Sequence, residues 1–267
     1  MIGVGPFSIQ VVTVIAAIVL AWVVARVVAA RRPEVSCKAA GALIFDSVFW
    51  GLLAARLAYV VQWWDEYWAR PMSMIAVGDG GFIWWVGLGV AIVYIWRRTH
   101  RAKGLRIPVL VGVAAGVLAW GVAGAVLNLM RDAAPPLPNL SLTTLDERPV
   151  SLSTYAGRPV VLNLWASWCP PCRREMPVFE QAQAELPGVA FVLVNQGESA
   201  QQAQNFLDGE GLNLTNVLLD PASQAMKSMR SNGLPTTLFF DAQGRLVDSH
   251  LGEITMPSLK DNISRNF

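Results

Sequence analysis

The chain has 267 residues, of which 54% are hydrophobic and 15% are charged, and its formal net charge is +2. This composition is too apolar for a wholly soluble protein, and the apolar excess lies in the first half of the chain. The nearly balanced charge, with no basic cluster among exposed aromatic residues, excludes the usual nucleic-acid-binding classes.

Four apolar spans predict a transmembrane domain over residues 1–131. Each span reaches or approaches the ~20 residues that a helix needs to cross a bilayer. The third is the shortest and is interrupted by glycine. The alternative, a soluble protein with buried helices, would have too little polar surface to keep four such segments dissolved. The spans cover residues of about 7–28, 42–64, 80–96 and 107–130.

Basic residues gather between spans one and two and between spans three and four, whereas the loop 65–79 carries Arg70 among acidic residues. The positive-inside rule places the two basic loops in the cytoplasm. We therefore expect a multi-pass protein of the bacterial cytoplasmic membrane with both chain ends on the extracytoplasmic side. The basic residues are Arg31, Arg32, Lys38, Arg97, Arg98, Arg101, Lys103 and Arg106.

Cysteine is absent from the predicted spans, and Cys37 falls in the first basic loop. Cys37 is expected to be an incidental thiol on the reducing side of the membrane. The first span lacks a basic leader and a cleavage site, so we expect an uncleaved anchor. With no cysteine pair in the membrane, electrons for redox chemistry must be exchanged with a separate protein.

A proline-rich segment, residues 132–139, is predicted to be a semi-rigid linker. Two short strand-like runs around Leu142 and Val150 follow, on either side of the turn residues that begin at Asp146. This pattern predicts a β-hairpin ahead of the remaining C-terminal elements.

Two cysteines, Cys169 and Cys172, stand at a predicted strand-to-helix junction. Residues 159–165 form a short apolar run typical of a buried strand, and Pro170 and Pro171 suit the first turn of a helix. The helix dipole favours a thiolate at Cys169, which would attack the disulfide of a partner. Cys172 would then resolve the mixed disulfide.

Two other uses of the cysteine pair compete with this interpretation, half of a zinc site and an inert structural disulfide. Zinc needs four ligands, and outside the pair the chain offers only Cys37, His100 and His250 in scattered places. A disulfide across so short a loop constrains the unfolded chain little. We therefore favour a redox-active disulfide and expect no metal and no other cofactor.

The rest of the C-terminal half alternates between strand and helix patterns, which predicts an α/β domain over residues 140–267. Strands are expected at 189–194 and 217–219, helices at 199–210 and 222–230, a strand pair at 238–240 and 246–247, and a last helix from about Met256.

These C-terminal segments resemble the periplasmic thioredoxin-like reductases of the TlpA and ResA type. The resemblance covers residues from about 138 to 267 and implies a thioredoxin fold. It also implies a reductase that serves cytochrome c maturation, copper-site assembly or disulfide repair. The matching segments, in the family's order, are 140–146 with 149–157, 168–172, 194–199 and 233–240.

The same resemblance implies roles for residues outside the cysteine pair. Pro235 matches the family's cis-proline, which lies against the cysteines and leaves backbone groups free for a substrate strand. Its neighbours Leu234 and Thr236 are expected to help dock the substrate. Trp168 is expected to shield Cys169 and to offer an apolar docking face.

Glu175 aligns with the acidic residue that ResA-like proteins place near their thiols. A carboxylate there would raise the thiol pKa values by repulsion and could relay the resolving proton. The alternative is a solvated residue that complements the helix N-terminus. Asn163 stands where thioredoxin has a buried aspartate, and an amide does not take up a proton at neutral pH. Glu175 is therefore the expected base.

The direction of electron flow is predicted from the same neighbourhood. Pro170 and Pro171 remove backbone donors that would stabilise the Cys169 thiolate, whereas Arg173 and Arg174 act in the opposite sense. A less stabilised thiolate means a lower reduction potential, which favours a reductant.

The membrane half has a weaker resemblance, to prolipoprotein diacylglyceryl transferase, over residues 5–9, 56–59 and 78–87. It departs from that family because Trp-Val stands in place of His-Gly and because later segments with functional arginines are absent. The resemblance implies lipid or partner recognition through Arg56 and Tyr59. The alternative is an anchor whose arginine snorkels to the membrane surface or pairs locally.

The sequence therefore predicts an all-α membrane domain of four transmembrane helices followed by an α/β thioredoxin-like domain with an N-terminal β-hairpin. The predicted activity is extracytoplasmic thiol-disulfide reduction. The alternatives are an oxidase or isomerase, a lipid-modifying transferase or lipid-binding protein with a fused redox domain, and a binding module that uses the pair for stability. The expected partners are a disulfide-bearing protein, a separate membrane electron donor of the DsbD or CcdA kind, and the bilayer.

Overall fold

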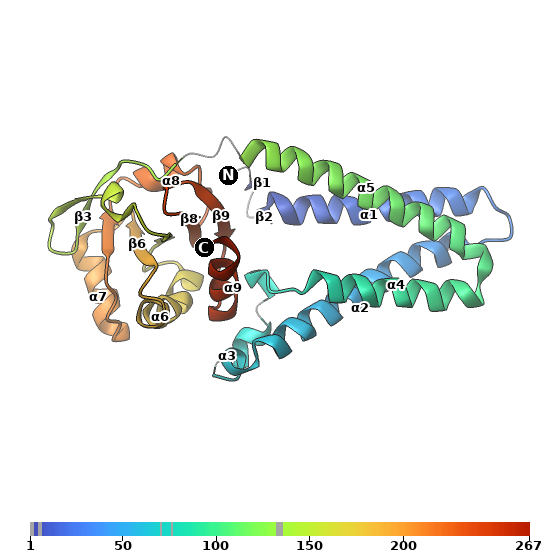
Figure 1. The fold of residues 1–267 in the computed structure, drawn as a ribbon, viewed down its shortest axis with the longest axis horizontal. Helices are drawn as coiled ribbons and strands as arrows, with labels where there is room; N and C mark the ends of the chain where they lie inside the picture. The colour runs from blue at the N-terminus through green and yellow to red at the C-terminus, as the bar shows by residue number, and fades with distance from the viewer. Residues whose placement is uncertain (1–2, 5–6, 70, 76, 132–135) are drawn as a thin grey trace. The chain divides into compact units, whose positions relative to one another are not determined.

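The computed structural model describes residues 3–4, 7–69, 71–75, 77–131 and 136–267. These residues form two compact units, one built from the long N-terminal helices and one from the C-terminal sheet and its helices (Figure 1). Residues 132–135 of the expected linker 132–139 lie outside the described residues.

The helical unit consists of long apolar helices joined by short segments. Helix α1 packs along α5, and α2 packs along α1 and α4 (Figure 1). The α-helices are α1 (Ile9–Ala30), α2 (Cys37–Gln62), α3 (Trp64–Ala69), α4 (Trp84–Arg101) and α5 (Arg106–Arg131), and the 3-10 helices are η1 (Pro71–Ile75) and η3 (Lys103–Leu105). A further 3-10 helix, η2 (Val77–Asp79), ends within the segment Gly78–Gly80, which belongs to the C-terminal unit.

Glycine allows these helices to approach closely. A Cβ atom on Gly112 of α5 would lie 2.5 Å from the carbonyl oxygen of Ala21 in α1, and one on Gly87 of α4 would lie 2.7 Å from that of Gly51 in α2. A helix backbone cannot move aside to make room for a Cβ atom, as a flexible side chain can. These close contacts therefore require glycine.

Among the described residues, three helices are long and apolar enough to cross a membrane, and they cover Val11–Ala30, Cys37–Gln62 and Lys103–Val126. Large apolar side chains are exposed on them, as expected for surfaces that face lipid. The expected span at 80–96 falls on α4, which is not among the three. Its apolar stretch from Trp84 to Trp96 is only ~20 Å long, because arginines follow it.

The C-terminal unit is organised around a seven-stranded sheet of order β4-β3-β7-β6-β5-β8-β9. The central strands β5, β6 and β7 are parallel, and the other neighbours are antiparallel, including β3 with β4. The strands are β3 (Ser141–Thr144), β4 (Pro149–Ser151), β5 (Val160–Trp165), β6 (Ala190–Gln196), β7 (Val217–Asp220), β8 (Thr236–Phe240) and β9 (Leu246–Leu251). The same unit includes the short antiparallel pair β1 (Gly3–Val4) and β2 (Phe7–Ser8).

Helices cover both faces of this sheet, so its central strands are buried on both sides. One face packs against α6 (Pro170–Glu185), α7 (Ala200–Glu210) and α9 (Met256–Asn266), and the other packs against η4 (Leu152–Tyr155) and α8 (Gln224–Ser228). Successive residues of β5 point to opposite faces, so Val161 packs under α6 while Leu162 packs under α8. Because both faces of β5 are buried, the run 159–165 is apolar almost throughout and does not alternate between polar and apolar residues.

Candidate active site

The cysteine pair lies where β5 ends and α6 begins. Cys169 is the N-cap of α6, with an extended backbone, and its Sγ accepts a hydrogen bond from the backbone N–H of Cys172 at 3.3 Å. Pro170 and Pro171 occupy the first turn, where a missing N–H leaves no hydrogen bond unmade. The helix N-terminus therefore presents its positive end to the Cys169 sulfur.

Cys169 and Cys172 are joined by a disulfide, with their Cα atoms 5.3 Å apart. Cys172 is fully buried and Cys169 is 3% exposed, so Cys169 is the sulfur that a partner reaches first. Trp168 is 67% exposed beside it, whereas Trp165 is buried against Phe206. The remaining cysteine, Cys37, begins α2 as a free thiol.

Glu175 lies one turn beyond Cys172 on the inner face of α6 and is 1% exposed. Its Oε1 accepts a hydrogen bond from Asn163 Nδ2 at 2.8 Å, and its Oε2 accepts one from the backbone N–H of Ile254 at 3.0 Å. Asn163 Nδ2 also donates to Thr237 Oγ1 at 3.1 Å. A carboxyl group is thus enclosed between α6, two strands of the sheet and the segment before α9.

Burial raises the pKa of Glu175 from 4.5 to about 8, and the two hydrogen bonds from Ile254 and Asn163 only partly oppose that rise. A carboxyl group with this pKa is mostly protonated at neutral pH and can exchange a proton near it. The alternative of a solvated residue at the helix N-terminus is therefore wrong, because the side chain points into the interior.

The peptide bond between Leu234 and Pro235 is cis, and it leads directly into β8. Leu234 is half-buried and packs against both cores of the unit. Thr236 is fully buried, and its hydroxyl group bonds to Gly233 O and to Ser231 Oγ, each at 2.7 Å. Of the three expected docking residues, Trp168 and Leu234 therefore reach the surface, whereas the Thr236 side chain does not.

An open hollow of about 350 Å³ borders the active-site segment. Ser167 and Arg173 form one side of it, and Asn205 and Phe206 of α7 form the other. Arg173 stacks over the ring of Phe206 at 5.1 Å from its centroid. The hollow is therefore a polar recess, with one aromatic wall, next to the helix that carries the cysteines.

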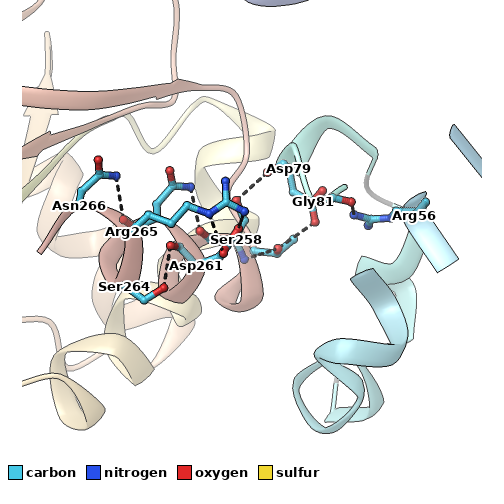
Figure 2. Close-up of polar contacts among 10 residues, drawn as sticks. Arg56, Asp79, Gly81, Ser258, Asp261, Ser264, Arg265 and Asn266 are labelled. Atoms are coloured by element: carbon cyan, nitrogen blue, oxygen red, sulfur yellow. Dashed lines mark hydrogen bonds and ion pairs between the residues drawn. The ribbon is translucent and has the colours of Figure 1, made fainter. Parts of the chain in front are cut away.

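In the helical unit, Arg56 of α2 is 7% exposed and donates to backbone carbonyl oxygens. Its NH1 donates to Gly81 O at 2.9 Å, as Figure 2 shows, and its NH2 donates to Met74 O at 3.0 Å. The guanidinium group also lies over the ring of Tyr67, which contacts the ring of Tyr59. Arg56 and Tyr59 are thus brought together, and Arg56 pairs locally with the segment that follows α3.

Sequence reasoning did not identify Thr237 or the Ile254 amide as partners of the Asn163–Glu175 pair. Thr237 follows Pro235 by two residues and, with Thr236, is one of two polar residues at the start of a strand that continues as Leu-Phe-Phe, which is a usable signal. Ile254 acts through its backbone, so its side chain carries no signal.

Each half of the chain matches a model of a known protein family. Residues 132–263 match the family model described as Redoxin, and residues 1–130 match the one described as Prolipoprotein diacylglyceryl transferase. The chain is similar to the thiol-disulfide oxidoreductase ResA of Bacillus subtilis, with 32% identity over 46% of this chain and 70% of that protein. It is also similar to ResA of Halalkalibacterium halodurans, with 31% identity over 60% of this chain and 90% of that protein.

Among solved structures, the chain is similar to a putative thiol:disulfide interchange protein DsbE from Chlorobium tepidum. The identity is 30% and the TM-score 0.46, over 50% of this chain and 96% of that chain. The relatives, the Redoxin match and the paired cysteines agree on the chemistry. The chain belongs to the ResA family of thiol-disulfide oxidoreductases, and its redox domain follows an N-terminal half that matches prolipoprotein diacylglyceryl transferase.

Proposed function

We propose that this oxidoreductase is a membrane-anchored reductase of disulfides in extracytoplasmic partner proteins. The observation that carries the proposal is the protonatable carboxyl group of Glu175, buried one helical turn from Cys172 behind a disulfide at the start of α6. A reductase must take up and release protons as its dithiol opens and closes, and this group is suited to that task.

The proposed reaction begins from the dithiol form. The Cys169 thiolate attacks one sulfur of the partner's disulfide, which forms a mixed disulfide and releases the partner's other sulfur as a thiolate. The ionised fraction of Glu175, which is the minor form at neutral pH, accepts the proton of Cys172. The Cys172 sulfur then attacks Cys169 Sγ and displaces the partner's sulfur. The Cys169–Cys172 disulfide forms, and the partner's two thiolates take up one proton from Glu175 and one from solvent, so that the partner leaves as a dithiol. Two electrons thus pass from the cysteine pair to the partner.

The backbone around Cys169 supports the proposed direction, the reduction of partner disulfides. Pro170 and Pro171 carry no N–H, so the first turn of α6 offers the Cys169 thiolate fewer donors, and the observed donor is the amide of Cys172. A weakly stabilised thiolate supports a reduction potential nearer to that of thioredoxin, about −270 mV, than to that of DsbA, about −120 mV.

The proposed location rests on the loops of the helical unit. Basic residues end α4 and surround η3, which the positive-inside rule assigns to the cytoplasm. With α4 as a fourth, short span, both chain ends and the redox domain face the extracytoplasmic side, where protein disulfides persist. Re-reduction then requires a separate membrane dithiol donor of the DsbD or CcdA kind.

Partner docking is proposed at the exposed surface beside Cys169. Trp168 offers an apolar face there, Leu234 and the cis Pro235 lie before β8, and the hollow at Ser167 and Arg173 receives polar groups of the partner. Arg56 is assigned to holding the segment after α3, because its guanidinium group donates hydrogen bonds to backbone carbonyl oxygens of that segment.

The proposal is tested in two steps with the full-length protein. Equilibration of detergent-solubilised protein with glutathione or dithiothreitol couples measures the reduction potential, and a value above about −170 mV would contradict the reductase assignment. In cells, Cys172→Ala should trap mixed disulfides with partners through Cys169, whereas Cys169→Ala should trap far fewer. Equal trapping by both variants would show that Cys169 is not the attacking sulfur.

A further inference from the structure

Glu198, a second buried carboxylate, lies in the segment that follows β6 and has no part in the reaction described above. The residue is 5% exposed. Because removing a carboxylate from water is costly, a buried one requires specific hydrogen-bond donors, and these show what it holds in place.

The donors to Glu198 come mainly from the segment that carries the active site. Glu198 Oε2 accepts a hydrogen bond from the backbone N–H of Ser167 at 2.7 Å and one from Asn195 Nδ2 at 2.6 Å. Its Oε1 accepts a third hydrogen bond from Ser167 Oγ. Hydrogen bonds to an ionised acceptor are roughly twice as strong as those between neutral groups. Both oxygens of the Glu198 carboxylate therefore accept hydrogen bonds from Ser167.

The sheet explains why these residues meet. Strands β5 and β6 are parallel, and Trp165 pairs with Asn195, so the segments that leave their carboxyl ends emerge side by side. Ser167 lies two residues beyond Trp165 and two before Cys169. The Cys169 amide in turn donates to Ala166 O at 3.2 Å. Glu198 thus ties the short connection between β5 and Cys169 to the neighbouring strand.

We propose that Glu198 is a positioning residue for thiol-disulfide exchange, and that it holds Cys169 at the N-terminus of α6 by clamping Ser167. The clamp matters most when the Cys169–Cys172 bond is open, because the covalent tie between Cys169 and the first turn of α6 is then absent. This role concerns the exchange activity itself and is independent of the direction of electron flow.

The clamp has a measurable consequence for the Cys169 thiolate. The Cys172 amide and the helix dipole stabilise that thiolate only at close range. If the connection is released, the Cys169 sulfur moves away from them and its pKa rises. A purely structural carboxylate would alter stability without altering this titration.

The experiment compares three variants of the full-length reduced protein in one detergent. The rate of alkylation of Cys169 by iodoacetamide is followed against pH by mass spectrometry, and thermal unfolding is measured in parallel. Glu198→Ala should raise the pH at the midpoint of the profile. At pH values below the midpoint, a rise of one pH unit in that midpoint lowers the thiolate fraction about tenfold. Glu198→Gln should restore the wild-type midpoint, because its carboxamide can accept from Ser167 N–H and donate to Ser167 Oγ.

Asp220 offers a matched control at the end of β7. It is 2% exposed, and it accepts hydrogen bonds from the amides of Gln224 and Ala225 rather than from the active-site segment. Asp220→Ala should lower the thermal midpoint of unfolding and leave the alkylation profile unchanged. The same upward shift in Asp220→Ala as in Glu198→Ala would overturn the proposal.

Two further outcomes decide the matter. An unchanged or lowered midpoint in Glu198→Ala would show that the carboxylate does not position Cys169, and would overturn the proposal. If Glu198→Ala does not fold, Ser167→Ala decides instead, since it removes the Oγ contact alone. A smaller upward shift in Ser167→Ala supports the clamp, and an unchanged profile refutes it.

Discussion

Replacement of Glu175 by glutamine should remove a large pH dependence from the stability of the oxidised redox domain. Burial raises the pKa of Glu175 from 4.5 to about 8. Between these values the unfolded chain has released a proton that the folded chain retains. The free energy of unfolding therefore falls by about 1.4 kcal/mol for each pH unit of rise, or about 5 kcal/mol over the interval. The contribution is complete below pH 4.5 and lost as the pH rises through about 8.

Glutamine suits the site because it has the shape of the protonated acid. Its oxygen accepts the amide hydrogen bond from Ile254. The side-chain NH2 group of the glutamine faces Asn163, whose Oδ1 is buried and lacks a hydrogen-bond partner among the described residues. Rotation of the Asn163 amide presents that oxygen to the new donor. The variant should therefore match the wild type at low pH and exceed its stability by several kcal/mol above pH 8.

The measurement is urea unfolding of the full-length oxidised protein in one detergent, at about pH 5 to 9, followed by pulse proteolysis of the redox domain. Glu185→Gln is the matched control on the same helix. Hydrogen bonds from Lys260 and then Gln181 hold the Glu185 pKa below its usual value, so this carboxylate does not titrate in the range tested. Parallel pH curves for wild type and Glu175→Gln would refute the reasoning, because they would show that Glu175 is ionised when folded.

Three other substitutions, one of them paired with a control, test contacts within each of the two units. Gly112→Ala should destabilise the helical unit by about 1–3 kcal/mol, because the new methyl group meets a backbone carbonyl of α1, whereas Gly124→Ala meets nothing within 4 Å and should be tolerated. Thermal unfolding in detergent compares the two, and equal losses would contradict the close packing. Phe179→Ala, at a fully buried position, should cost about 3–5 kcal/mol in urea unfolding of the redox domain, and a loss below about 1 kcal/mol would place Phe179 outside the core. Arg56→Ala should speed proteolytic cleavage of the segment after α3, since the carbonyl groups there lose their donor, and unchanged cleavage would show that the arginine does not hold it.

Much of the site could be predicted because its signals are local. The cysteine spacing, the two prolines and the apolar run before them predicted a strand, a helix start and a thiolate at Cys169, and the structure has Cys169 as the N-cap of α6. The third span was harder to judge from sequence. Its glycines and the arginines that end α4 leave a short apolar stretch, and α4 is not among the three described helices that are long and apolar enough to cross a membrane.

The environment of Glu175 was only partly predictable. Its position three residues after Cys172 indicated that it lies near the thiols, but a residue at that spacing could equally have faced solvent. Burial under α6 decided the question, and the pKa of about 8 follows from burial rather than from any neighbour in the sequence. Its amide partner Ile254 is 79 residues away along the chain.

Residues close together in the chain were enough to predict most of the long helices and sheet strands and the chemistry of the cysteine pair, because helix caps, strand periodicity and apolar length are local signals. The tertiary structure alone decided which buried polar groups meet. The parallel pairing of β5 with β6 brings Glu198 to Ser167, and the packing of α6 on the sheet brings Glu175 to Asn163. Such contacts depend on strand order and on the direction of each side chain, which residues distant in sequence settle only when the chain folds.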